Sequence, residues 1–354
     1  MRFALHFGGP DLPARRLRDL LAERVEGVPA GGRILFATYY FRDRDLARRL
    51  VAARQRGVDV RVVLDGHPRT PRANRGVVEL LRGPQGLGSG FRLSRSRSDG
   101  SRLGKLLRPR LHEKLYVFSH PKPAAFIGSF NPSGDEPEEA PEVIAEIQDQ
   151  DRGHNLLLEL AEPAVVAALS VHAEQLQRER FAWFARFGND ANRSHRFGDL
   201  ELHFRPRLRS DPLRDLLAGL GAGVRLRLCA SHLSGRTATR EFAALLRRGA
   251  QLEILSEATP RRVPPETERA LVGAGARLRR IAHPEGLPMH NKFLLIEGPS
   301  RRVSVLGSFN WTEPSLRLNR EIGIVCSDPK LFDALAARWE ILDGMAQGPA
   351  RRRA

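Results

Sequence analysis

The stretch LHEKLYVF, residues 111–118, and its counterpart MHNKFLLI, residues 289–296, decide the fold of this 354-residue sequence. Each contains a His and a Lys two residues apart, and each precedes a copy of G-S-F-N, at residues 128–131 and 307–310. The two histidines are 178 residues apart and the two serines 179. A single H-x-K or G-S-x-N means little, since the latter is ordinary turn chemistry. Two such pairs at matched spacing indicate an internal duplication.

The residues that follow each H-x-K predict a β-strand, because aliphatic and β-branched side chains dominate them. Alternation along a strand would place the His and the Lys on one face, and each G-S-F-N predicts a strand end entering a tight turn. The candidate sets are His112, Lys114, Ser129 and Asn131 in the first copy, and His290, Lys292, Ser308 and Asn310 in the second. An imidazole, an ammonium, a hydroxyl and a carboxamide, gathered twice, suit an oxyanion held between two histidines.

The repeat covers nearly the whole chain. The matching pairs are FALHF (3–7) with LELHF (200–204), RILFATYYF (33–41) with RLRLCASHL (225–233), and RGVDVRVVLD (56–65) with RGAQLEILSE (248–257). Similar helical patterns occupy residues 45–56 and 240–248. The offset of 192 in the last two pairs falls to 178 at the histidines, which marks about fourteen extra residues around the basic segment 94–110 of the first copy.

Each half therefore predicts strand, helix, strand, helix, then three strands and a helix. This order is typical of a mixed sheet flanked by helices. The expected fold class is α/β, a pseudo-twofold duplication of two α/β/α domains. We expect a first repeat at residues 1–180, a linker at 181–198, a second repeat at 199–346, and a basic tail at 347–354.

These motifs resemble the signature of the phospholipase D superfamily, H-x-K-x4-D followed by G-S-x-N, with one copy in each half. The resemblance implies an enzyme that cleaves or exchanges phosphodiesters through a covalent phosphohistidine, with no metal or organic cofactor. It also implies that the signature Asp, replaced here by Ser119 and Glu297, is structural. The superfamily includes phospholipases, cardiolipin synthases and nucleases, so the resemblance leaves the substrate class open.

A further carboxylate distinguishes the two histidines. The resemblance places Glu321 where the family has a His-orienting acid, and aligning REIGIVCSDP with HNLLLELAEP places Asn155 at the matching position of the first half. Because an adjacent carboxylate favours the charged imidazole, we expect Glu321 to raise the pKa of His290 and make it the general acid. An amide partner leaves His112 neutral and suited to nucleophilic attack, and the resemblance agrees with this order.

The remaining candidate residues have supporting roles. Lys114, Lys292, Asn131 and Asn310 would hold the non-bridging phosphoryl oxygens as negative charge develops on them. Ser129, Ser308 and Asn155 would orient neighbouring groups or contact the substrate, although a turn hydroxyl bonded to backbone is the alternative for the serines.

Composition narrows the setting. There are 58 Lys and Arg against 41 Asp and Glu, a net charge of +17, which attracts nucleic acid or an anionic membrane surface. The alternative explanation of the positive charge is the Arg-rich residue usage that a GC-rich genome produces. Cys229 and Cys326 fall in predicted strands and are expected to be core residues, without a disulfide or metal site. The sequence has no run of eighteen apolar residues and no hydrophobic signal core, and it predicts a cytoplasmic protein, with peripheral membrane binding.

Short stretches point to different substrates. SLRLNRE (315–321) resembles cardiolipin synthases, whereas MHNKF and GSFNWT resemble single-copy endonucleases and mitochondrial cardiolipin hydrolases. The acidic segment 135–146 would repel a threading polyanion, which favours a compact phospholipid head group. We therefore expect hydrolysis or head-group exchange on a phospholipid by a single active site per monomer. Nucleic acid is the alternative substrate, and a binding protein without catalysis is disfavoured because both His–Lys–Asn sets are intact.

Overall fold

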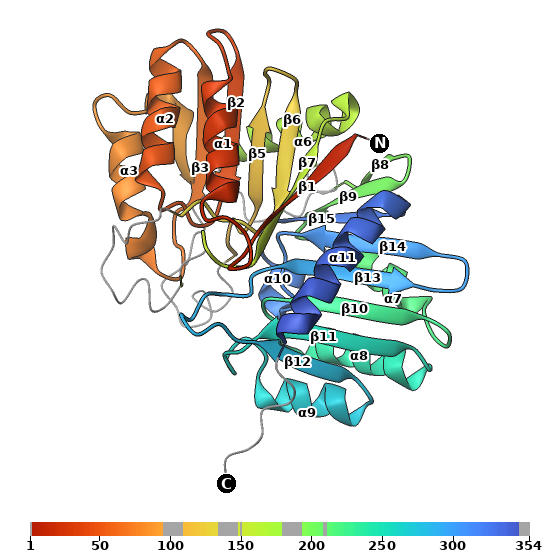
Figure 1. The fold of residues 1–354 in the computed structure, drawn as a ribbon. Helices are drawn as coiled ribbons and strands as arrows, with labels where there is room; N and C mark the ends of the chain where they lie inside the picture. Colours follow the sequence, from red (N-terminus) through yellow and green to blue (C-terminus); the bar gives the residue numbers. More distant parts are fainter. Residues whose placement is uncertain are drawn as a thin grey trace. The chain divides into compact units, whose positions relative to one another are not determined.

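The computed structural model describes residues 2–94, 109–133, 148, 151–178, 193–207 and 211–346. The chain divides into two compact units, Met1–Ala191 and Asn192–Ala354, and each contains one sheet covered by helices (Figure 1). This organisation confirms the predicted α/β class and the internal duplication. Most of the basic segment, the acidic segment, the aromatic part of the linker and the basic tail lie outside the described residues.

The sheet of unit 1 has seven strands in the order β1-β7-β6-β5-β2-β3-β4. Strands β2, β3 and β4 run parallel to one another, whereas the other neighbours pair antiparallel. The elements of unit 1 are β1 (Phe3–Gly8), α1 (Arg16–Glu26), β2 (Arg33–Thr38), α2 (Arg44–Gln55), β3 (Asp59–Asp65), η1 (Pro71–Asn74), α3 (Arg75–Arg82), η2 (Gly88–Gly90), β4 (Phe91–Ser94), β5 (Lys114–Phe118), β6 (Ala124–Gly128), β7 (Asn155–Leu160) and α6 (Pro163–Arg178).

The sheet of unit 2 has eight strands in the order β12-β11-β10-β13-β14-β15-β9-β8. Its parallel strands are β10, β11 and β12. The elements of unit 2 are β8 (His195–Phe197), β9 (Leu200–Arg205), α7 (Pro212–Ala218), β10 (Arg225–Ala230), α8 (Arg236–Arg247), β11 (Gln251–Glu257), α9 (Pro265–Gly273), β12 (Arg277–Ile281), β13 (Lys292–Glu297), β14 (Arg302–Gly307), α10 (Glu313–Arg317), β15 (Glu321–Cys326) and α11 (Pro329–Met345).

The two sheets have one topology. Strands β4, β3, β2, β5, β6, β7 and β1 follow the same order as β12, β11, β10, β13, β14, β15 and β9. Unit 2 adds β8 at the edge, paired antiparallel with β9, and its three residues lie in the segment that the sequence predicts as linker. The repeated sequence therefore encodes a repeated strand order.

Helix α2 shows how the sequence produces these elements. Asp43 caps its N-terminus by accepting a hydrogen bond from the Leu46 backbone N–H at 2.9 Å. Leu46, Leu50 and Ala53, spaced four and three residues apart, form its buried stripe. The matching helix α8 begins at Arg236. The sequence predicts its start four residues later, because the segment RTAT lacks the apolar spacing that marks a helix interior.

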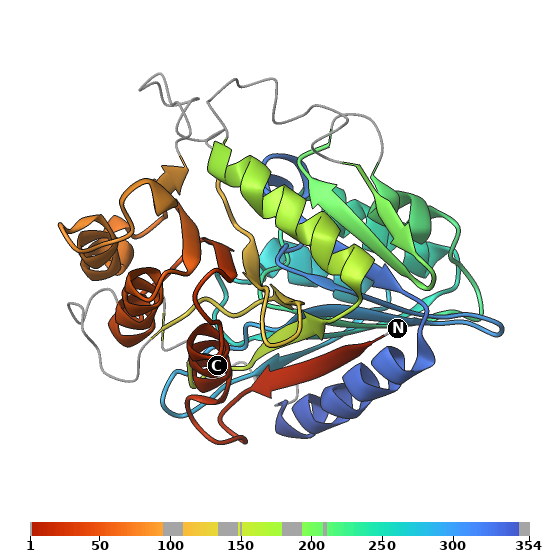
Figure 2. The same ribbon diagram turned by 90° about the horizontal axis from the view of Figure 1, so that it is seen from above.

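Helices cover both faces of each sheet. In unit 1, α1, α2 and α3 share an apolar core with the strands, and α6 lies on the opposite face (Figure 2). In unit 2, α7, α8 and α9 cover one face and α11 covers the other, where Trp339 contacts Phe293 edge-on at 6.5 Å between ring centroids. Cys229 and Cys326 are free and buried in strands, as predicted.

Sequence patterns missed α1 and β4, and their counterparts α7 and β12. Strand β4 is four residues long and only half-buried at the sheet edge, so its alternation of apolar and polar residues is too short to mark a strand clearly. The central strands β5 and β6 are buried on both faces along their whole length. The H-x-K and G-S-F-N motifs thus lie at the ends of the most tightly held strands.

Candidate functional site

Each H-x-K motif folds into the same local structure. Strands β5 and β13 begin at Lys114 and Lys292, so each His lies just before its strand. Lys114 Nζ donates to the backbone carbonyl of His112 at 2.7 Å, and Lys292 Nζ donates to that of His290 at 3.0 Å. Both lysines are buried. The ammonium is thereby held at the backbone of the His in each half.

The G-S-F-N motifs end β6 and β14 in closely packed backbone. A Cβ on Gly128 would lie 2.2 Å from the Leu156 carbonyl oxygen, and one on Gly307 would lie 2.2 Å from that of Ile322. No side chain fits at that distance from a backbone oxygen, so both positions require glycine. Each serine hydroxyl that follows then accepts a hydrogen bond from the facing strand, Ser129 Oγ from Leu156 N–H at 3.0 Å and Ser308 Oγ from Ile322 N–H at 3.1 Å.

The same serines contact the two residues that the sequence alignment pairs. Ser129 donates to Asn155 Oδ1 at 3.0 Å, whereas Ser308 donates to Glu321 Oε2 at 2.5 Å. Glu321 also accepts from Asn319 Nδ2 at 3.4 Å. All four side chains of these serine pairs are fully buried. An amide and a carboxylate therefore occupy equivalent places, and the serines act as orienting groups bonded to backbone and side chain.

The two motif asparagines differ in their surroundings. Asn131 Oδ1 accepts a hydrogen bond from the Tyr40 backbone N–H at 3.3 Å. Asn310 Oδ1 is buried and has no hydrogen-bond partner within the part of the chain that the structure describes. The oxygen of the Asn131 amide is therefore held by backbone of unit 1, whereas that of Asn310 has no such contact among the described residues.

Sequence reasoning missed Tyr39. Its ring meets the His112 ring edge-on, with 5.1 Å between centroids, and Lys114 Nζ lies 5.7 Å from the Tyr39 centroid. The Tyr39 hydroxyl accepts hydrogen bonds from the Arg69 backbone N–H, at 2.6 Å, and from Arg110. Burial, together with the neighbouring Tyr40, raises the pKa of Tyr39 well above its usual value, so the phenol stays neutral. The repeat gave no signal, because the matching residue of the second half is Ser231.

Asp65, at the end of β3, is a second missed residue. Its carboxylate accepts from the backbone N–H groups of Leu111, at 2.6 Å, and His67, at 2.8 Å, which fixes the chain just before His112. The matching Glu257 in unit 2 binds Arg262 at 3.2 Å. Arg262 also contacts the ring of His232 at 2.6 Å. Both halves thus have a carboxylate at this place, but Asp65 binds backbone N–H groups whereas Glu257 binds an arginine side chain.

The residue between His and Lys also differs. Glu113 is fully buried and both of its oxygens lie 2.9 Å from Nε2 of His172 on α6. The matching Asn291 is fully buried, and neither its oxygen nor its nitrogen has a hydrogen-bond partner among the described residues. The residue just before β5 is thus tied to helix α6 by a polar pair, and the matching residue before β13 has no such pair among the described residues.

The two replacements of the signature Asp both occupy structural positions. The Ser119 hydroxyl accepts from the Arg33 backbone N–H at 2.7 Å, joining the end of β5 to the start of β2. Glu297 lies 3.6 Å from Arg227 and 3.8 Å from Arg302 at the matching end of β13. Each side chain contacts a neighbouring strand at the end of β5 or β13 that is farther from the His.

A family model described as "cardiolipin synthase, PLD-like domain" matches residues 29–162 and 220–341, one stretch in each unit. The chain belongs to the phospholipase D family. Each matched stretch contains one H-x-K and one G-S-F-N, so the family assignment and the internal duplication rest on the same residues.

Relatives within the phospholipase D family match parts of this chain. A mitochondrial cardiolipin hydrolase of Danio rerio is 28% identical over 112 residues, which are 32% of this chain and 48% of that protein. One of Chlamydomonas reinhardtii is 41% identical over 54 residues, 15% of this chain and 23% of that protein. The chain therefore spans less than half the length of these relatives.

Two solved structures share the fold over almost the whole chain. Phosphatidylserine synthase of Haemophilus influenzae superposes with a TM-score of 0.67 at 13% identity, covering 97% of this chain and 87% of that protein. Polyphosphate kinase of Porphyromonas gingivalis gives 0.60 at 15% identity, covering 96% and 50%. At such identities the likeness concerns the fold alone.

Within the described ranges, no helix is both long and apolar enough to cross a membrane. Those ranges also contain no group of three or more His, Cys, Asp and Glu side chains placed to hold a metal ion.

Proposed function

We propose that this protein is a phosphodiesterase or phosphatidyltransferase that acts on a phospholipid through a phosphohistidine, at one active site formed by both halves of a monomer. The observation that carries the proposal is the local geometry built twice. In each half a buried lysine is bonded to the carbonyl of the motif histidine, and the motif serine is bonded to Asn155 or Glu321. A phosphodiester needs a nucleophile and a general acid on opposite sides of phosphorus, and two such half-sites supply them.

In the proposed first step, a ring nitrogen of His112 attacks phosphorus and the bond to the leaving alcohol breaks. His290 gives that alcohol its proton. Lys114, Lys292, Asn131 and Asn310 balance the charge that builds on the non-bridging oxygens. In the second step His290 removes a proton from water or an acceptor alcohol, which attacks phosphorus and releases His112.

The proposed order of the two histidines rests on the difference between Asn155 in the first half and Glu321 at the matching place in the second. Glu321 bonds to Ser308 at the place where Asn155 bonds to Ser129 in unit 1, and a carboxylate near His290 would favour imidazolium over imidazole. His290 is therefore assigned as the acid and His112 as the nucleophile. Tyr39 supports this assignment because its neutral ring lies against His112.

The phospholipid substrate is supported by the relatives named as cardiolipin hydrolases and by the family model named for cardiolipin synthase. A nucleic-acid phosphodiesterase is the second candidate, favoured by the net charge of +17. The sequence-based prediction of a cytoplasmic protein that binds membranes peripherally remains part of the proposal, as does activity of the monomer. The two relatives are mitochondrial proteins by name.

A release assay tests the function directly. Purified protein is offered anionic phospholipid vesicles, single-stranded DNA and double-stranded DNA in parallel, each with and without EDTA. We expect release of the lipid head group or of phosphatidic acid, unchanged by EDTA. Cleavage of DNA alone would select the nuclease, and activity lost with EDTA would contradict the phosphohistidine route.

A further inference from the structure

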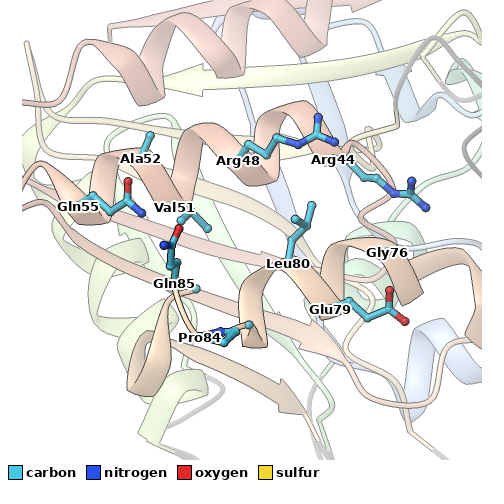
Figure 3. A pocket seen from close by; sticks show the side chains of 12 residues that line it. Arg44, Arg48, Val51, Ala52, Gln55, Gly76, Glu79, Leu80, Pro84 and Gln85 are labelled. Atoms are coloured by element: carbon cyan, nitrogen blue, oxygen red, sulfur yellow. The ribbon is translucent and has the colours of Figure 1, made fainter.

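A groove of about 790 Å³ lies between α2 and α3 on the outer side of unit 1 (Figure 3). Its volume is within the range of small-molecule sites. It is lined along α2 from Arg44 to Gln55, a span of about 16 Å along the helix, and on the other side by α3 and the turn that follows it. The groove contains none of the motif residues, so the proposed chemistry leaves it without a role.

The two ends of the groove differ in chemistry. Arg44 and Arg48, one helical turn apart, gather at one end, and the carboxamides of Gln55 and Gln85 lie at the other (Figure 3). Between them Val51 from α2 and Leu80 from α3 form an apolar stretch, and the carboxylate of Glu79 also lines the groove on the α3 side. Arg48 is exposed and makes no hydrogen bond, ion pair or ring contact with the residues that the structure describes. A guanidinium in this state is available to an anionic ligand.

A glycine makes room for the second guanidinium. A Cβ on Gly76, in the first turn of α3, would lie 2.4 Å from Arg44 Nε and 2.9 Å from its Cζ. Glycine weakens a helix by roughly 1 kcal/mol relative to alanine. Its presence here lets the Arg44 guanidinium lie flat against α3 at the end of the groove, beside Arg48.

The surface around the groove is strongly basic. Exposed arginines on the same two helices and their flanking turns are Arg54, Arg56, Arg72, Arg75 and Arg82. Among the acids of residues 44–86, Asp45 and Asp59 pair with arginines, Asp65 is buried, and Glu79 lines the groove. An extended anionic surface would be attracted to this face.

We propose that this groove binds the head group of an anionic phospholipid at a membrane surface, as a docking site separate from the motif residues. The phosphate would sit on Arg44 and Arg48, the glycerol region and first acyl carbons on Val51 and Leu80, and polar head-group atoms on the glutamines. Nucleic acid fits less well, because the lining has no aromatic side chain on which a base could stack. The apolar middle of the groove would face a polar sugar-phosphate backbone.

Binding of a monomeric short-chain lipid separates the groove from general charge attraction. The probe is dihexanoylphosphatidic acid below its micelle concentration, titrated into the full chain by calorimetry. Arg48→Gln and Gly76→Ala should each weaken binding about tenfold, the second by displacing Arg44 without changing charge. Arg54→Gln removes the same charge from the same helix outside the groove and should leave this affinity unchanged. Gly76→Ala should keep or raise the melting temperature, because alanine favours the helix.

Turnover of a small soluble phosphodiester is measured on the same variants and should not change, which separates this site from the proposed function. Sedimentation with phosphatidylcholine vesicles, with and without phosphatidic acid, should show the same ranking of variants on a membrane. Equal losses for Arg48→Gln and Arg54→Gln would overturn the groove in favour of diffuse attraction. Short-chain lipid that fails to saturate, or normal binding by Gly76→Ala, would overturn it too.

Discussion

In the first half the hydroxyl of Ser129 donates to the amide of Asn155, and in the second the hydroxyl of Ser308 donates to the carboxylate of Glu321. The backbone around these pairs is the same, with glycine packed against a facing carbonyl at an equal distance in each. The duplication has thus preserved the groups that would hold a phosphate and changed a charge that would tune a histidine. The same backbone with an amide in one half and a carboxylate in the other suits a reaction in which one histidine attacks and the other transfers protons.

Replacing each histidine by Asn gives the largest expected contrast. Both His112→Asn and His290→Asn should lower turnover of a phospholipid by about 10⁴-fold or more, because each removes a group needed for bond breaking. With a nitrophenyl phosphodiester, whose leaving group needs little protonation, His290→Asn should still form the adduct on His112 and accumulate it. Rapid denaturation without acid, followed by mass spectrometry, detects the phosphohistidine. An adduct mapped to His290 in the unaltered protein would reverse the two roles.

Exchanging the carboxylate and the amide tests the asymmetry itself. Glu321→Gln should lower turnover about 100-fold near neutral pH, because His290 loses the charge that favours its protonated form. Its limb of the pH–rate profile should move to lower pH. Asn155→Asp should instead make His112 more basic, so that activity appears only at higher pH. Unmoved profiles in both variants would show that these partners do not set the roles.

The residue between His and Lys offers a comparison of stability. Glu113→Gln should lower the free energy of unfolding by about 2 kcal/mol, because it disrupts a buried hydrogen-bonded contact with His172. Asn291→Val should be neutral or stabilising, because it removes a buried amide without a partner in the described part of the chain. Denaturant unfolding measures both. A loss in Asn291→Val as large as in Glu113→Gln would indicate that Asn291 has a partner after all.

The two halves also differ at matching histidines in β1 and β9. His6 Nε2 bonds to Glu159 at 2.9 Å, whereas His203 is buried, and burial, reinforced by Arg207 and Arg205 and opposed by Glu201, lowers its pKa to about 4. Because the unfolded chain binds this proton with a pKa of about 6.5, stability is full above that pH and falls as the pH drops toward 4. The expected loss is about 1 kcal/mol between about pH 7 and about pH 5.5.

His203→Gln should remove this part of the acid sensitivity, whereas the matched variant His6→Gln should leave it in place. Chemical unfolding at a series of pH values gives the slope. An acid limb of equal steepness in His203→Gln and the unaltered protein would contradict the assignment to His203.

The sequence alone sufficed for the duplicated α/β class, the central motif strands and the pairing of Asn155 with Glu321. These features depend on local patterns. Apolar runs indicate strands, and an internal repeat shows which residues occupy equivalent places even when their chemistry differs. The serines' role as orienting groups also follows from turn chemistry, although only the structure named their partners.

Tertiary structure alone placed Tyr39 against His112, tied Asp65 to the chain before that histidine, and paired Glu113 with His172. These contacts join residues 73, 46 and 59 positions apart in the chain, and no local pattern encodes such a pairing. The repeat could not show them either, since the matching Ser231, Glu257 and Asn291 do not make these contacts among the described residues. Which side chains meet around a histidine is decided by the packing of strands and helices, because a sequence pattern fixes the face a residue occupies but not its neighbour across the sheet.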